Sequence, residues 1–268
     1  MGSEAITLAV FDARLQSAVT SIQQAGGPAQ SNSAMQTGLR ASVLRSLILD
    51  TVIAQEATAL GIEATEADVD AQVSAAERQS GGASGLQTAL AEAGGSIAQL
   101  RDEIRSQLNE QRLEDHFAKQ RVELVEQQLA SGQSFASLAQ SSSDDTGTSS
   151  KGGDLGALTS ADLAGDDPAF VGAVRALHIG AYTTAPVHDS GGYDIVELYA
   201  TTPATWSVRH ILVAAPTPYT VKGRPAWFSE ALFSTVAQLC SQHRIHVFIS
   251  DAGGDPCSGA PLATPAPG

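Results

Sequence analysis

One uninterrupted helical pattern constrains the fold of this chain most. Between Ser96 and Gly132, apolar residues recur at three- and four-residue spacing, and serine and glycine commonly begin and end helices. The apolar positions are Ile97, Leu100, Ile104, Leu108, Leu113, Phe117, Val122, Val125 and Leu129. A helix of about 30 residues is longer than a compact domain needs. Since 268 residues also exceed the usual size of one domain, we expect this helix to join two domains.

The residues before this helix show only helical patterns. A wide apolar face runs along a segment that Gly61 ends. Thr65 and Asp68 have the spacing of an N-terminal cap, and the glycine-rich run 81–85 ends the helix that they begin. The expected helices cover residues 7–24, 43–60, 65–80 and 86–93. We therefore predict an all-helical N-terminal domain.

After Gly132 the pattern becomes mixed. A Ser/Asp/Thr/Gly-rich loop covers 141–153, and alternating or β-branched runs indicate strands. The expected elements are a helix at 135–138, strands at 193–199, 208–213 and 245–249, and a helix at 227–242. The fold class is thus α+β, with a helical domain followed by one that contains a sheet. A Pro/Ala-rich tail, 258–268, is expected to be disordered.

Charge and motif content exclude several function classes. The formal charge is −14 and no Lys/Arg cluster stands out, so binding to nucleic acid would be opposed electrostatically. No P-loop, HExxH or GxSxG motif occurs, and we expect no metal and no cofactor. His243 and His246 are read as residues that end a helix and begin a strand. The other histidines outside the site discussed below, His116, His178 and His188, are scattered.

Export is inferred from indirect signs. Cys240 and Cys257 are the only cysteines, and they either form one disulfide in an oxidising compartment or are two free thiols. Met1-Gly2-Ser3 reads as an artificial start, so we expect that a native signal peptide has been removed. The sequence leaves a lipid anchor on the native protein open.

A series of spaced motifs resembles the parvulin family of peptidyl-prolyl isomerases. The glycines of Gly152-Gly153-Asp154-Leu155-Gly156 can adopt backbone conformations closed to other residues, which suits a sharp turn. The motif elements are Gln133–Phe135 with Leu138-Ala139, Ser143–Asp145, Gly152–Gly156, Phe170 with Ala173 and Leu177, Gly180, Pro186-Val187 and Gly192–Ile195. The resemblance implies an antiparallel sheet flanked by helices and isomerase activity on X-Pro bonds.

The first part resembles the N-terminal region of SurA. Glu4–Thr7 is similar to the end of the strand and turn that open such domains, and 44–61 followed by 63–65 and Val69 resembles the helix pair that follows. Together the two resemblances imply an extracytoplasmic folding factor of the SurA/PrsA kind. The implied domains are a SurA-like domain at 4–118, a parvulin-like domain at 119–214, an extension at 215–257 and the tail at 258–268.

The chain departs from the parvulin pattern in the place of one strand. The strand that normally opens the domain reads HILV, and here His210–Val213 follows the last expected strand instead. We expect a four-stranded antiparallel sheet whose first strand has moved to residues 207–213, as in a circular permutation. Two other arrangements stay open: a strand exchanged between two molecules, and the remnant of a second, degenerate parvulin repeat.

The resemblance also implies site residues. Leu163 and Phe170 would line a proline-binding cup, Asp145 would be the polar residue before the glycine loop, and His210 would be one of two buried histidines. Asp194 stands where the family has the second histidine, and an ionised carboxylate only accepts hydrogen bonds. It either pairs with His210 or faces solvent. Leu163 and Phe170 could equally be plain core residues. Asp145 could be one of several solvated loop acids, and His210 a hydrogen-bonded core histidine.

The predicted function is that of an extracytoplasmic chaperone and prolyl isomerase whose isomerase activity is weak. Its partners would be unfolded or proline-containing polypeptides, and a homodimer formed by strand or helix exchange is an open alternative. A catalytically inactive parvulin-fold interaction module is the competing prediction. Asp194 and the displaced His210 strand favour the second reading, and Asp145 with the glycine loop and Phe170 favours the first.

Overall fold

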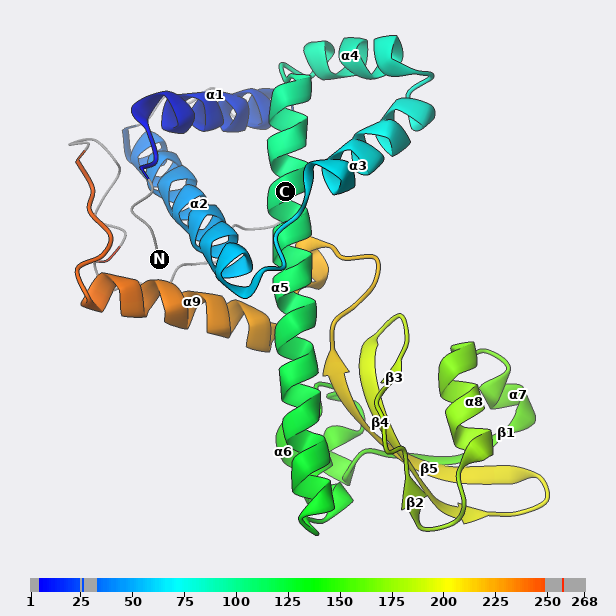
Figure 1. Cartoon of the computed structure of the whole chain (residues 1–268). Helices are drawn as coiled ribbons and strands as arrows, with labels where there is room; N and C mark the ends of the chain where they lie inside the picture. The colour runs from blue at the N-terminus through cyan, green and yellow to red at the C-terminus, as the bar shows by residue number, and fades with distance from the viewer. Residues whose placement is uncertain (1–4, 25, 27–32, 249–256, 258–268) are drawn as a thin grey trace. The chain divides into compact units, whose positions relative to one another are not determined.

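The structure is a computed structural model that describes residues 5–24, 26, 33–248 and 257 (Figure 1). The chain forms two compact units, one made of 1–113 with 229–268 and the other of 114–228. Helix α5, Ile97–Ala130, contributes residues to both, as expected for the long helix. The four-part division predicted from the sequence stays a prediction.

The first unit is helical. Its helices are α1 (Leu8–Gln24), α2 (Ser33–Leu60), α3 (Glu66–Gln79), α4 (Ala83–Glu92), the first part of α5 and most of α9 (Ala226–Ser241). Thr65 and Asp68 form the predicted capping box of α3, and Gly61 ends α2 with a positive φ of 68°. The break between α3 and α4 is shorter than predicted. Gly81 and Gly82 have positive φ values and form the turn, and α4 already begins at Ala83.

Helix α9 completes the core of the first unit. Val236 and Leu239 of α9 pack in one buried cluster with Phe11 of α1 and with α2, whose contributing residues are Val43, Leu44, Leu47, Ile48 and Val52. The cluster therefore joins the two ends of the described chain. None of the helices in the described ranges has the length and apolar character required to cross a membrane.

The predicted strand at 245–249 is wrong for the residues that the structure describes. Residues 245–248 have no regular secondary structure, and Ile249 lies outside the described residues. An isolated extended segment has no ladder partner for its backbone groups, so hydrophobic character alone does not make it a strand. The Ile245 side chain instead packs against the helical cluster, and Phe248 is exposed. His246 consequently begins no strand, whereas His243 follows the end of α9 as expected.

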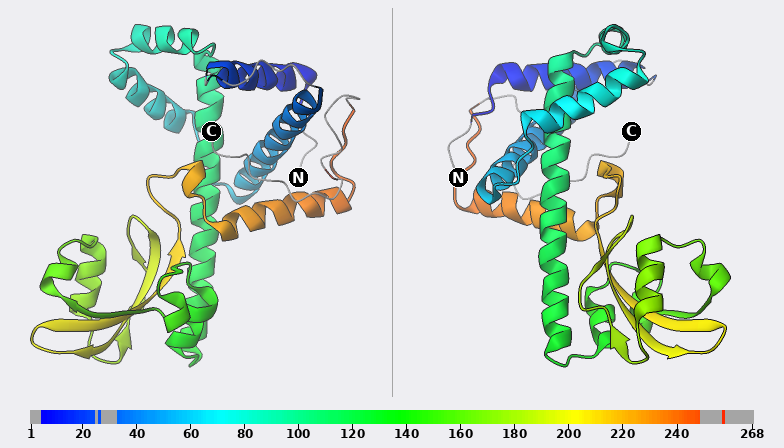
Figure 2. Two further views of the ribbon diagram at one scale, coloured as in Figure 1. Left: turned by 180° about the vertical axis from the view of Figure 1, so that it is seen from behind. Right: turned by 45° about the vertical axis from the view of Figure 1, so that its right-hand side comes forward.

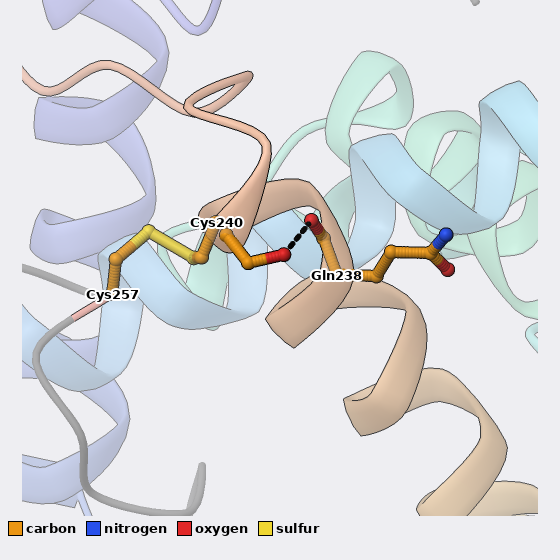
Figure 3. Close-up of a disulfide and its surroundings, with 4 residues drawn as sticks. Gln238, Cys240 and Cys257 are labelled. Carbon is orange, nitrogen blue, oxygen red and sulfur yellow. Dashed lines mark hydrogen bonds between the residues drawn. A yellow bond between two sulfur atoms is a disulfide. The ribbon is translucent and has the colours of Figure 1, made fainter.

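A disulfide joins Cys240, near the end of α9, to Cys257 (Figure 3). The two Cα atoms are 5.5 Å apart, which is within the usual range for a disulfide. The Cys240 side chain also packs against the core cluster of the first unit. Of the two readings of the cysteines, the bonded one describes the structure. The predicted disordered tail, 258–268, lies outside the described residues.

The second unit is an antiparallel sheet with helices on both faces. The strands are β1 (Asp154–Thr159), β2 (Ala181–Tyr182), β3 (Val187–His188), β4 (Gly192–Thr201) and β5 (Thr205–Ala214). The order is β1-β5-β4-β2, and β3 also pairs with β4. The second part of α5 and α6 (Phe135–Ser142) cover one face, and α7 (Ser160–Leu163) and α8 (Pro168–Ala176) cover the other (Figure 2).

The displaced strand completes the sheet of its own chain. β5 lies between β1 and β4 and pairs with both, with His210 opposite Val196 and Leu212 opposite Asp194. The strand order is thus that of the first of the three arrangements, with the HILV strand moved to the end of the domain. The predicted α+β fold is confirmed, although the described sheet has five strands where four were expected, because the short β3 also pairs with β4.

Candidate functional site

Two carboxylates hold the His210 ring between them. The Nδ1 atom of His210 lies 2.8 Å from Oδ1 of Asp194, and the Nε2 atom lies 2.9 Å from Oδ2 of Asp145. Asp194 is on β4 and His210 on β5, whereas Asp145 comes from the loop after α6. His210 and Asp194 are buried, and the Asp145 side chain retains 26% of its exposure. Asp194 therefore pairs with His210 and does not face solvent.

Thr148 joins this network, although no motif in the sequence had singled it out. Its Oγ1 atom donates a hydrogen bond to Oδ2 of Asp145 and lies 3.1 Å from Nε2 of His210. A hydroxyl can act as donor and acceptor at once, which lets Thr148 bridge a carboxylate and an imidazole. The only sequence signal was its place in the polar loop that precedes the glycine turn.

The protonation of the network follows from burial and pairing. Burial by itself would lower the pKa of His210, but the hydrogen bonds and negative charges of Asp194 and Asp145 outweigh it, and the pKa is raised. Burial opposes the ionised form of Asp145, yet hydrogen bonds from Thr148 and His210 hold its pKa below the ordinary value. Burial raises the pKa of Asp194, although the hydrogen bond to His210 works in the opposite direction. The arrangement is thus suited to an imidazolium that donates to two carboxylates.

Gly153 allows the loop to lie directly on β5. Its φ is +77°, and a Cβ atom added there would come within 2.1 Å of the His210 carbonyl oxygen. The His210 N–H donates to the Gly153 carbonyl at 2.9 Å. A side chain at this position would therefore push the loop away from the strand that carries His210.

Leu163 and Phe170 belong to the core on the same face of the sheet as the polar network. They pack with Val174, Val196, Leu198 and Val208, and their relative exposures are 1% and 7%. Val196 is the direct cross-strand neighbour of His210, so the apolar cluster adjoins the imidazole. The structure thus brings all five predicted site residues to one face of the sheet, with Leu163 and Phe170 mostly covered by neighbours.

Comparison with known proteins identifies both parts of the chain. The SurA-like N-terminal domain matches residues 1–114, and the PPIC-type PPIASE domain matches residues 97–200. The first part of the chain is thus similar to a SurA-like N-terminal domain, and the second part to a PPIC-type isomerase domain. A 74-residue segment is 42% identical to Chaperone SurA of Chromohalobacter salexigens, and an 88-residue segment is 41% identical to Chaperone SurA of Sodalis glossinidius.

The likeness to these relatives is partial. The matched segments cover 28% and 32% of this chain but only 16% and 20% of the two SurA proteins. A crystal structure of peptidylprolyl isomerase (PrsA) from Bacillus anthracis is 20% identical, covering 76% of this chain and 98% of that one. Its TM-score of 0.29 is too low to support an argument about structure.

The displaced strand lies outside the matched region. The match to the PPIC-type domain ends at residue 200, so β5 and His210 lie beyond it. The structure nevertheless places His210 beside Asp145, which lies within the match. Across the described ranges, no group of three or more His, Cys, Asp or Glu side chains could hold a metal ion.

Proposed function

We propose that this chain is an extracytoplasmic folding factor that binds unfolded, proline-containing polypeptides and isomerises X-Pro bonds weakly through its second unit. The observation that carries the proposal is the polar network of Asp145, His210 and Asp194 beside the apolar cluster of Leu163 and Phe170. An apolar surface next to polar groups is what recognition of a proline and its preceding carbonyl requires.

The chemistry of prolyl isomerisation needs no nucleophile, metal or cofactor. Rotation about the X-Pro bond has a barrier of about 20 kcal/mol because amide resonance is lost, and it takes about 10–100 s without a catalyst. A site accelerates it by binding the twisted amide better than the planar one. In this chain Phe170, which is 7% exposed, would contact the ring with the buried Leu163 behind it, while Asp145, held by Thr148 and His210, would face the amide.

Asp194 is the reason for proposing weak activity. A neutral histidine in its place could donate and accept, whereas an ionised carboxylate accepts only. His210 then has both ring nitrogens occupied by carboxylates, and Asp145 is tied into the same network. Asp145 and His210 therefore have fewer free hydrogen-bonding positions with which to stabilise the twisted amide.

The location and the holding function rest on other observations. A disulfide is typical of oxidising, extracytoplasmic compartments. The SurA-like N-terminal domain, and relatives named Chaperone SurA, support a polypeptide-holding role for the helical unit. The holding role extends to unfolded clients of unspecified sequence.

A second candidate is an interaction module that has kept the parvulin fold and lost turnover. The pairing of His210 with Asp194 in place of a second histidine favours it. It predicts binding of proline peptides without acceleration of their isomerisation.

One experiment separates these functions. Isomerisation of an X-Pro peptide is measured by exchange NMR without a coupled protease, and suppression of aggregation of an unfolded protein is recorded on the same sample. Acceleration together with suppression supports the proposal, and suppression alone supports the holding function. Absence of both would refute a folding role.

A further inference from the structure

The loop that carries Asp145 is fastened along the edge of β5. The Asp144 N–H donates to the Leu212 carbonyl at 2.8 Å, and the Leu212 N–H donates to Ser143 Oγ at 3.1 Å. The Ala214 N–H donates to Oδ2 of Asp144 at 2.9 Å. These bonds occupy backbone groups of β5 beyond the register in which it pairs with β1.

Asp144 is itself held by an arginine on α5. The Arg121 Nη1 atom is 2.8 Å from Oδ2 of Asp144, and Nη2 is 3.3 Å from Oδ1, so the guanidinium contacts both carboxylate oxygens. The two side chains retain only 30% and 21% of their exposure. A two-point contact of this kind fixes direction as well as distance.

Trp227 contacts both Arg121 and the same edge of β5. The Arg121 guanidinium lies over the Trp227 ring at 4.6 Å, and the Trp227 Nε1–H donates to the Ala214 carbonyl at 3.2 Å. Both backbone groups of Ala214 are therefore engaged, one by Asp144 and one by Trp227. All these residues belong to the second unit.

The chain order explains why side-chain contacts are needed to hold this loop against β5. β5 follows α6 by a long stretch of sequence, so no short covalent link sets the loop after α6 against the strand that carries His210. We propose that Arg121, Asp144 and Trp227 form a latch that positions Asp145 against His210. These three are positioning residues. Arg121 contacts Asp144, and Asp144 contacts the edge of β5, whereas none of the three belongs to the proposed proline-binding cluster.

The test uses the full chain with Arg121→Gln, Arg121→Lys and Arg175→Gln. Arg175 is the matched control, because its guanidinium lies over Trp206 at 5.9 Å, on an exposed helix position of the same unit. The readout is the NMR titration of the His210 ring. Loss of the Arg121 charge alone would raise the pKa of His210, whereas release of Asp145 would lower it, so the two effects have opposite signs.

A released latch lowers the pKa of His210 in Arg121→Gln, and the lysine variant restores it in part. Arg121→Gln also lowers kcat/KM for the prolyl peptide by roughly tenfold or more, because a misplaced polar group at the site slows the reaction by such factors. Arg175→Gln changes neither. In an Asp145→Asn background, Arg121→Gln no longer lowers the pKa of His210, because its effect acts through Asp145.

A pKa of His210 that is unchanged or raised in a folded Arg121→Gln protein would overturn the latch. Should that variant fail to fold, Asp144→Asn is judged by the same criterion. The inference rests on the proposed function for its kinetic readout only. A wild-type protein without turnover would refute the proposed catalysis, and the His210 titration would still decide the latch.

Discussion

The Nδ1 atom of His210 and Oδ1 of Asp194 are 2.8 Å apart across two neighbouring strands, and both residues are buried. Their closeness follows from the sheet register, in which Asp194 and His210 lie one step diagonally across β4 and β5 on the same face. A buried carboxylate with this partner is far less costly than one without. The pair explains how an aspartate is tolerated at this position.

The unfolding free energy should depend on pH through His210. Its pKa is raised in the folded protein above the ordinary value of 6.5, so its contribution is complete below that pH and is lost as pH rises through the folded pKa. We expect a decrease of about 1 kcal/mol between mildly acidic and alkaline pH, measured by urea unfolding. His210→Gln should abolish this decrease. Parallel pH curves for the two proteins would contradict the charged pairing.

Asp194→Asn should destabilise the second unit. The amide preserves shape and one acceptor but removes the charge that faces the imidazolium, so we expect a loss of about 1–3 kcal/mol in denaturant unfolding. Asp166→Asn, at an exposed position, is the control and should stay within about 0.5 kcal/mol of the parent. An Asp194→Asn protein as stable as the parent would place the proton on Asp194 instead of on His210.

Gly153→Ala and Gly156→Ala separate steric conflict from backbone strain. Both glycines have positive φ values, 77° and 79°, but an added Cβ would meet the His210 carbonyl oxygen at Gly153 and nothing within 4 Å at Gly156. We expect a cost of about 1 kcal/mol for Gly156→Ala from strain alone, and a larger one for Gly153→Ala. Thermal unfolding measures the difference, and equal costs would mean that the loop yields freely.

Reduction of the disulfide should destabilise the first unit. Cys240 and Cys257 are separated by 17 positions, and closing a loop of that size stabilises by about 3 kcal/mol in the chain-entropy account. We expect a lower midpoint of thermal unfolding in the presence of reductant. A Cys240→Ala, Cys257→Ala protein should unfold at the same temperature with and without it. A parent protein that is insensitive to reductant would show that the bond adds nothing.

The helical elements could be predicted because their ends are chemically marked. The Thr65–Asp68 cap and the glycine at 61 gave boundaries that agree with α2 and α3. The strand expected at 245–249 failed because hydrophobic residues were read without a pairing partner. Alternation alone does not tell a strand from an extended segment packed on helices.

Of the candidate site, only the residues that match the parvulin pattern could be predicted from the sequence. Asp145, His210 and Asp194 were selected by resemblance, and the pairing of the last two was one of two alternatives. The bonds of Arg121 and Asp144 join positions 23 residues apart, and those of Trp227 depend on the chain returning along β5. Such contacts follow from the tertiary arrangement, which no local pattern specifies.

The most direct test of the account is exchange NMR on an X-Pro peptide with the parent protein and with Asp145→Asn. The account predicts isomerisation faster than the uncatalysed 10–100 s, by a modest factor, and its loss in the variant, with Asp166→Asn as a control that retains it. If the folded parent protein neither accelerates isomerisation of the peptide nor binds it, that result contradicts the assignment of this site to prolyl isomerisation.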